Sequence, residues 1–94
     1  MQTRIKQKFD LKNKVAIVTG ASKGIGESIA WGLAEYGAKV VISSRSQEAV
    51  DQVANNLREE GYDALGIACH VGDEAQLKKL VDETVNAYGG VDIL

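Results

Sequence analysis

The 94-residue sequence has no proline, one cysteine and no long apolar run. A lack of proline agrees with a chain made of regular elements and short turns. The single cysteine, Cys69, excludes an internal disulfide and a metal site built from several cysteines. No apolar run approaches the ~20 residues needed to cross a bilayer, and the charged start differs from a secretory signal. We therefore expect a cytoplasmic protein, with Cys69 as a small buried residue in a strand.

Charge is unevenly distributed along the chain, although the formal net charge is only -2. The first fourteen residues hold five cations and one anion, which leaves a net acidic remainder. We interpret residues 1–13 as a basic N-terminal arm that is solvated or contacts another subunit. Binding of nucleic acid through this arm is the alternative, and it predicts salt-sensitive retention on a polyanion. The cations of the arm are loosely spaced and the remainder of the chain is acidic, so we expect neither nucleic acid nor a membrane as a partner.

The overall composition is that of a water-soluble globular protein. Apolar residues make up 45% and charged residues 26% of the chain. A length of 94 residues allows one modest core and no second domain. The chain is therefore one domain or part of one.

Short β-branched runs alternate with longer segments of helical periodicity. The predicted strands are Val15–Val18, Lys39–Ser43, a weaker Ala64–Cys69, and the opening of a fourth at Val91–Leu94. The continuous rather than alternating apolar runs suit parallel strands that are covered on both faces. With right-handed crossovers, this β-α-β-α-β-α-β order predicts an α/β Rossmann fold with a doubly wound parallel sheet.

Three amphipathic helices separate the predicted strands. Gly37, Gly61 and the Gly89-Gly90 pair mark their ends. Ser46 is expected to cap the second helix, and Asp73 with Gln76 forms a capping box for the third. The apolar stripes are Ile25, Ile29, Ala30, Leu33 and Ala34 in the first helix, Val50, Val53, Ala54 and Leu57 in the second, and Leu77, Leu80, Val81, Thr84, Val85 and Tyr88 in the third.

A glycine-rich turn, Thr19–Gly26, lies between the first strand and the first helix. Gly20, Gly24 and Gly26 suit a tight turn, close approach of a diphosphate to the backbone, and close packing of helix on strand. The helix start also offers free N–H groups to an anion. The turn is not a P-loop, because its lysine precedes the glycine. Its place in a β-α-β unit favours nucleotide binding over a purely structural turn.

The spacing Gly-x-x-x-Gly-x-Gly after a threonine resembles that of the short-chain dehydrogenases/reductases. The resemblance covers nearly the whole chain, because residues 9–20 look like the family's entry and residues 89–94 like the approach to its fourth strand. Ser-Ser-Arg after the second strand and Cys-His-Val after the third are similar to tetrameric carbonyl reductases of the retinal-reductase type, and more loosely to acyl-carrier-protein reductases. The resemblance implies that Gly20, Ser22, Gly24, Ile25 and Gly26 contact a dinucleotide, and that the full-length protein is a homotetramer.

The end of the second strand favours NADP over NAD. Arg45 lies 19 positions after Gly26, where an NAD-binding protein usually presents a carboxylate, and residues 43–46 contain no acid. A guanidinium can bind a 2′-phosphate with two parallel hydrogen bonds. Ser44 adds a hydroxyl, and the resemblance implies a similar role for Lys23. The alternative is that Arg45 and Lys23 are solvated surface charges.

His70-Val71 follows the third strand where the family usually has Asp-Val, a pair that contacts the adenine. The histidine departs from this pattern. His70 can stack on the adenine, hydrogen-bond to it, or serve only a structural role, and no partner residue is suitably spaced for a metal site. We expect Trp31 to pack within the fold or against another subunit.

The resemblance implies hydride transfer between a nicotinamide and a ketone, an aldehyde or a secondary alcohol. The family's catalytic tyrosine, lysine, serine and asparagine all lie beyond residue 94, and the three tyrosines present lie in or beside helices. We therefore assign residues 1–94 to the N-terminal part of a single NAD(P)-binding domain, with no catalytic residue, no metal and no activity of its own. The alternative is a non-catalytic dinucleotide-binding module or scaffold protein.

Overall fold

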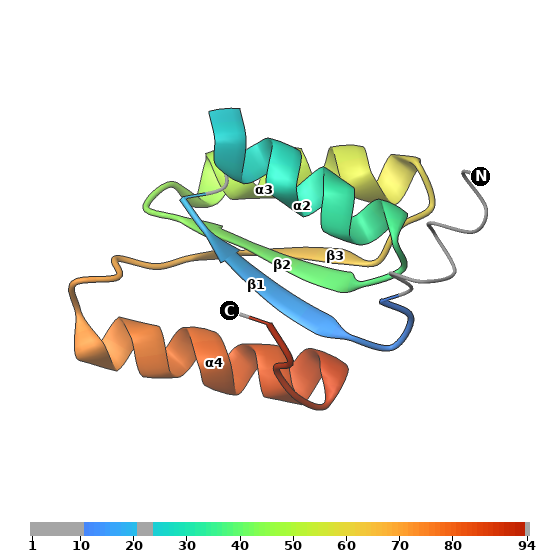
Figure 1. Ribbon diagram of the computed structural model, residues 1–94. Coiled ribbons are helices and arrows are strands. Elements are labelled where there is room, and N and C mark those ends of the chain that lie inside the picture. Colours follow the sequence, from blue (N-terminus) through green and yellow to red (C-terminus); the bar gives the residue numbers. More distant parts are fainter. Residues whose placement is uncertain (1–10, 21–23, 94) are drawn as a thin grey trace.

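The computed structural model describes residues 11–20 and 24–93. Strands and helices alternate along these residues (Figure 1). Their order is β1 (Val15–Thr19), α2 (Gly24–Glu35), β2 (Lys39–Ser44), α3 (Gln47–Glu59), β3 (Ala64–Ala68) and α4 (Glu74–Tyr88). The predicted α/β class is confirmed, and each strand boundary lies within one residue of its prediction. Most of the basic N-terminal arm lies outside the described residues.

The three strands form one parallel sheet in the order β1-β2-β3. Val15 pairs with Lys39, and Val40 pairs with Ala64. On its other side, β1 makes a parallel bridge between Ala16 and Ile93. The expected fourth strand is thus represented by a single bridge at Ile93. Because β2 pairs with one side of β1 and Ile93 pairs with the other, the strand order reverses at β1, as in a doubly wound sheet.

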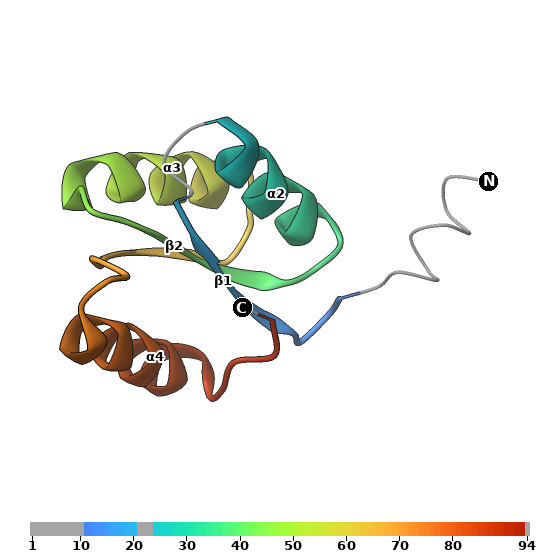
Figure 2. The ribbon, with the colours of Figure 1, turned by 60° about the vertical axis from the view of Figure 1, so that its left-hand side comes forward.

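Helices cover both faces of the sheet (Figures 1 and 2). The pair α2 and α3 lies on one face and α4 on the other. Each face has its own hydrophobic cluster, one including Ala30, Val40 and Leu57, and the other including Val41 and Leu80. Neighbouring residues of β2 thus bury their side chains on opposite faces, which explains the continuous apolar run in the sequence.

The predicted apolar stripe of α2 is only partly buried. Ala30 and Ala34 are buried, but Ile25 is 81% exposed and Ile29 is 50% exposed. The two alanines let the helix approach the sheet closely, whereas Ile25 lies in the first turn. Ile29 instead lines a hollow of about 220 Å³ that also includes Ile93. The two isoleucines thus lie on the predicted apolar stripe without being buried in the core, and the exposure of Ile25 is compatible with its expected contact with a dinucleotide.

The other two helices follow their predictions more closely. All four predicted apolar residues of α3 are buried, and the hydroxyl of Ser46 accepts the Ala49 N–H at 3.2 Å as the N-cap. In α4, Leu80 is buried, as is Thr84, whose hydroxyl donates to the Leu80 carbonyl at 2.8 Å. Val85 departs from the prediction, because it is 42% exposed.

The predicted capping box of α4 forms only in part. Asp73 caps the helix by accepting the N–H groups of Ala75 and Gln76. The side-chain oxygen of Gln76 does not return to the Asp73 N–H, as a capping box requires, but accepts the His70 N–H at 2.9 Å. The Asp73 N–H donates instead to the His70 carbonyl at 2.9 Å. The start of α4 is thereby tied to the end of β3.

Candidate functional site

A cavity of about 370 Å³ lies where the carboxyl ends of the three strands meet. Its lining residues are Thr19, Gly20, Ser43, Ser44, Arg45, Cys69 and Val71. They lie at the ends of β1 and β2 or directly after β1, β2 and β3, so the parallel sheet brings together three segments that are far apart in the sequence. Such strand ends are where doubly wound proteins bind their ligands, and the volume lies in the range of small-molecule sites.

The glycine turn supplies one wall of this cavity. Gly20 and Gly24 have φ angles of +66° and +64°, which confirms that the turn needs glycine there. Apart from each glycine's own chain neighbours, no atom of the described residues lies within 4 Å of the position that a Cβ would take at either glycine, so this part of the structure leaves the backbone open to an approaching group. Helix α2 begins at Gly24, and its first turn includes Ile25 and Gly26. The predicted contacts Ser22 and Lys23 lie outside the described residues.

Arg45 lies at the mouth of the cavity, directly after β2, and is exposed. No carboxylate among the described residues forms an ion pair with its guanidinium. The Ser44 hydroxyl accepts the Ser46 N–H at 3.3 Å and so shapes the turn that presents Arg45. Among the described residues, the lining of the cavity contains one cation and no acid, as expected for a site that accepts an anion.

His70 and Val71 mark the third side of the cavity. Val71 lines it and is 57% exposed, whereas His70 lies between Val71 and Cys69, which also lines it. Nδ1 of His70 accepts the Gly72 N–H at 3.1 Å. Among the residues described, no three metal-binding side chains gather, so the structure assigns His70 to no metal cluster.

Three cavity residues were not predicted from the sequence as site residues: Thr19, Ser43 and Cys69. Cys69 is buried, as expected, but lies one residue beyond the end of β3. Ser43 is fully buried, and its hydroxyl has no hydrogen-bond partner in the described structure. A serine within the buried run Val40–Ser43 was the available signal, because a polar residue rarely continues such a run without a reason.

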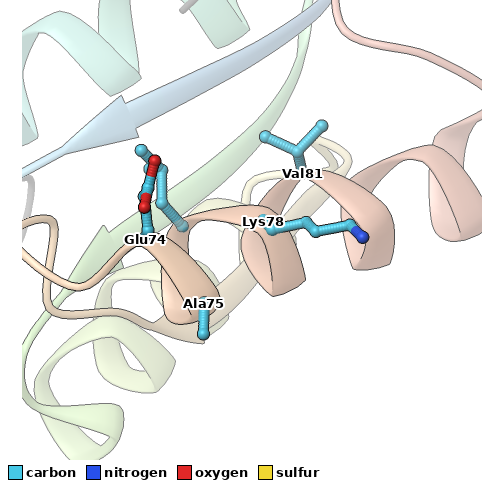
Figure 3. Close-up of a pocket in the computed structure, with 5 residues that line it drawn as sticks. Glu74, Ala75, Lys78 and Val81 are labelled. Carbon is cyan, nitrogen blue, oxygen red and sulfur yellow. The ribbon is translucent and has the colours of Figure 1, made fainter.

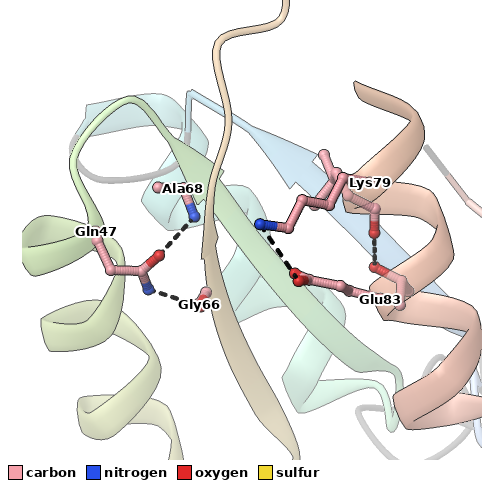
Figure 4. Close-up of polar contacts among 7 residues, drawn as sticks. Gln47, Gly66, Ala68, Lys79 and Glu83 are labelled. Carbon is pink, nitrogen blue, oxygen red and sulfur yellow. Dashed lines mark hydrogen bonds and ion pairs between the residues drawn. The ribbon is translucent and has the colours of Figure 1, made fainter. Parts of the chain in front are cut away.

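Gln47 holds two walls of the site together (Figure 4). Its amide nitrogen donates to the Gly66 carbonyl at 2.9 Å, and its amide oxygen accepts the Ala68 N–H at 2.9 Å. One side chain from the first turn of α3 thus pairs with the backbone of β3 at the edge of the sheet. This contact fixes the loop that carries Arg45 relative to the strand that leads to His70. The exposed Lys79–Glu83 ion pair in the same view, at 4.0 Å, contributes little to stability.

A second hollow, of about 460 Å³, lies along α4 (Figure 3). It is lined by Glu74, Ala75, Leu77, Lys78 and Val81, all from one helix. It shares no residue with the cavity at the strand ends, and it brings together no polar groups from different elements. We therefore place the candidate site at the strand ends, although the hollow on α4 is larger.

The fold and the glycine turn agree with the comparison to known families, because a short chain dehydrogenase model matches residues 14–94. The chain belongs to this family. It is 48% identical over 92 residues to pig dehydrogenase/reductase SDR family member 4, and 47% identical over 83 residues to tropinone reductase-like 3 of Erythroxylum coca. These matches cover 98% and 88% of the chain, but only 33% and 32% of the two relatives. The chain thus spans about a third of their length.

A solved structure shows the same relationship at the level of the fold. Hydroxysteroid dehydrogenase from Escherichia coli superposes with a TM-score of 0.87 at 35% sequence identity. The match covers 90% of this chain and 36% of the bacterial chain. Short-chain dehydrogenases are oxidoreductases that bind nicotinamide cofactors, NAD or NADP, so the cavity at the strand ends matches the chemistry of the family. In residues 11–20 and 24–93, no helix is long and apolar enough to span a membrane.

Proposed function

We propose that the full-length protein is an NADP-dependent oxidoreductase, and that residues 1–94 hold the adenosine half of the cofactor. The observation that carries the proposal is that Arg45 lines a cavity in which none of the lining residues that the structure describes is acidic. An anionic 2′-phosphate is attracted by a guanidinium and repelled by the carboxylate that would favour NAD. The bound cofactor supplies the hydride that is exchanged with substrate.

In this proposal, each wall of the cavity binds a different part of the cofactor. The backbone of Gly20 and the first N–H groups of α2 bind the diphosphate. Arg45 and Ser44, together with Lys23, bind the 2′-phosphate. His70 and Val71 contact the adenine. These residues bind and orient the cofactor, and the groups that transfer protons to and from the substrate belong to the rest of the protein.

The proposed substrates are small ketones, aldehydes and secondary alcohols. The names of two similar proteins, a tropinone reductase-like protein and a hydroxysteroid dehydrogenase, refer to substrates of these classes. We also propose that the protein is cytoplasmic and that it forms a homotetramer. The homotetramer is proposed because the sequence resembles tetrameric carbonyl reductases.

A titration of the full-length protein with NADPH and NADH tests the cofactor assignment. We expect NADPH to bind at least about ten-fold more tightly, a difference of about 1.4 kcal/mol. Arg45→Asp should narrow or reverse this preference, because a carboxylate then faces the phosphate. Lys78→Glu makes the same change of charge on α4, away from the cavity, and should leave the preference unchanged. Equal affinities in the unmutated protein would refute the assignment.

A further inference from the structure

Gln47 pairs with the outer edge of β3 as a residue of a neighbouring strand would. Within the described residues, β3 has a strand on one side only, which is β2. On the other side, the Gln47 amide nitrogen donates to the Gly66 carbonyl and the amide oxygen accepts the Ala68 N–H, both at 2.9 Å (Figure 4). A parallel strand also bonds to its neighbour through alternate residues in this way. The side-chain amide thus takes the place of a strand residue at this edge.

The amide of Gln47 has one orientation in this contact. An amide nitrogen has two hydrogens and can only donate, whereas the oxygen can only accept. The nitrogen donates to the Asp51 carboxylate at 2.8 Å as well as to the Gly66 carbonyl. A reversed amide would place its oxygen against two acceptors and its nitrogen against the Ala68 N–H. The side chain is therefore held both by its own helix and by β3.

The turn that carries Arg45 is short and is attached to β3 at both ends. Only Arg45 and Ser46 lie between the end of β2 and Gln47, the first residue of α3. Before the turn, the Ser44 carbonyl accepts the Cys69 N–H at 2.8 Å. After the turn, the side chain of Gln47 bonds to β3 as described above. The backbone of Arg45 is thus fixed relative to β3 from both sides, and its exposed side chain extends from that fixed point.

We propose that Gln47 is a positioning residue for cofactor selection, which holds Arg45 where its guanidinium can bind the 2′-phosphate of NADP. The inference rests on the proposed function, because Arg45 meets a phosphate only if the cavity holds that cofactor. Paired hydrogen bonds between a guanidinium and a phosphate depend on orientation. A turn released from β3 must be ordered again when the phosphate binds, which lowers affinity. NADH lacks the 2′-phosphate, so its binding should not depend on Gln47.

Gln47→Ala and Gln47→Met in the full-length protein test this role. Methionine keeps much of the side-chain length but cannot donate to the Gly66 carbonyl. Each variant should bind NADPH about three- to ten-fold more weakly, and NADH within about two-fold of the unmutated protein. A side chain that only stabilises the fold would affect both cofactors alike. An equal loss for NADPH and NADH, or no loss for either, would overturn the inference.

Arg58 provides the matched control. From the last turn of α3, its Nε donates to the Ala64 carbonyl at 2.8 Å, at the opposite end of β3. Arg58→Ala therefore removes a side-chain contact between the same helix and the same strand, but away from the turn. The ratio of NADPH to NADH affinity should stay within about two-fold of the unmutated protein. If Arg58→Ala lowers this ratio as much as Gln47→Ala does, the inference is wrong.

The contact itself can be measured without a cofactor. The Ala68 N–H donates to Gln47, whereas the next N–H, that of Cys69, donates to Ser44 inside the sheet. Gln47→Met should therefore speed hydrogen exchange at Ala68 by about five-fold or more, and leave the exchange at Cys69 unchanged. An Ala68 N–H that exchanges equally fast in both proteins would show that Gln47 does not hold β3, and would overturn the inference.

A double-mutant cycle determines whether Gln47 acts through Arg45. In an Arg45→Ala background, Gln47→Ala should cause no further loss of NADPH affinity relative to NADH. A further loss as large as in the unmutated background would overturn the inference. An unmutated protein that binds NADPH and NADH equally would overturn the proposed function and the inference together. A preference for NADPH that does not depend on Gln47 would overturn the inference alone.

Discussion

A carboxylate oxygen of Asp92 accepts the N–H of Val15 at 2.9 Å, across 77 positions of the sequence. The Asp92 and Ile93 N–H groups both donate to the Val15 carbonyl, at 2.8 and 3.0 Å. Val15 is the first residue of β1, so these bonds attach the segment after α4 to the start of the central strand. The side chain of Asp92 thus sets how this segment meets β1.

Asp92→Ala should lower the free energy of unfolding by about 1–2 kcal/mol, because it leaves the buried Val15 N–H without an acceptor. Asp92→Asn retains an oxygen in the same place and should recover much of this loss. Chemical denaturation measures both effects, with Asp82→Ala on the exposed side of α4 as the control. If Asp92→Ala lowers the free energy of unfolding no more than Asp82→Ala does, the hydrogen bond from Val15 to Asp92 does not stabilise the fold.

Gly66 of β3 lies directly against the backbone of α3. A Cβ at this position would lie 2.8 Å from the carbonyl oxygen of Val50 and 3.1 Å from the backbone nitrogen of Asp51. Backbone atoms of a helix cannot move aside as the end of a flexible side chain can. Gly66→Ala must therefore push α3 away from the sheet, or bend β3.

We expect Gly66→Ala to destabilise the protein by about 1–3 kcal/mol, the usual cost of overpacking. Gly32→Ala, within α2, is the matched control, because outside the nearby turns of its own helix no atom of the described residues lies within 4 Å of the new Cβ. Alanine favours a helix over glycine, so this control should be neutral or stabilising. Melting temperatures of the two variants test the comparison, and a Gly66→Ala protein as stable as the control would contradict it.

Local sequence patterns were sufficient to predict the three strands of the sheet, α3 and the position of Arg45. Each depends on signals within a few residues: β-branched runs, an apolar stripe with a serine cap, and the distance from the glycine turn. The exposure of Ile25 and Ile29 was not predictable in this way. Periodicity identifies the apolar side of a helix, but it does not show how far the sheet beneath that side extends.

The hydrogen-bond partners of polar side chains were the second feature that could be predicted from the sequence only in part. Asp73 caps α4 as predicted, because an N-cap depends on the helix that follows it. Gln76 instead pairs with His70, because the tight turn between β3 and α4 brings that N–H within reach. Gln47 likewise pairs with β3, which is about twenty residues away in the sequence. Such contacts depend on how elements pack, and no local pattern contains that information.

Tyr88, the last residue of α4, gives the fold a dependence on alkaline pH. Burial raises the pKa of its phenol above the ordinary value of 10.0, and the charge of Asp63 raises it further, while Arg58 acts in the opposite direction. The Lys39 amine lies 5.6 Å from the centre of the ring. The folded protein therefore keeps the phenol proton at a pH where the unfolded chain has begun to lose it.

The sign of the effect follows from this difference in proton binding. The stabilisation from Tyr88 is fully present below about pH 10 and is lost as the pH rises through the raised pKa of the folded state. Unfolding free energies measured from about pH 8 to about pH 11 should fall more steeply for the unmutated protein than for Tyr88→Phe. Because the Lys39 amine lies over the Tyr88 ring, the two proteins should be compared again in a Lys39→Gln background. If the slopes of the two proteins coincide in that background, the pH dependence does not come from Tyr88.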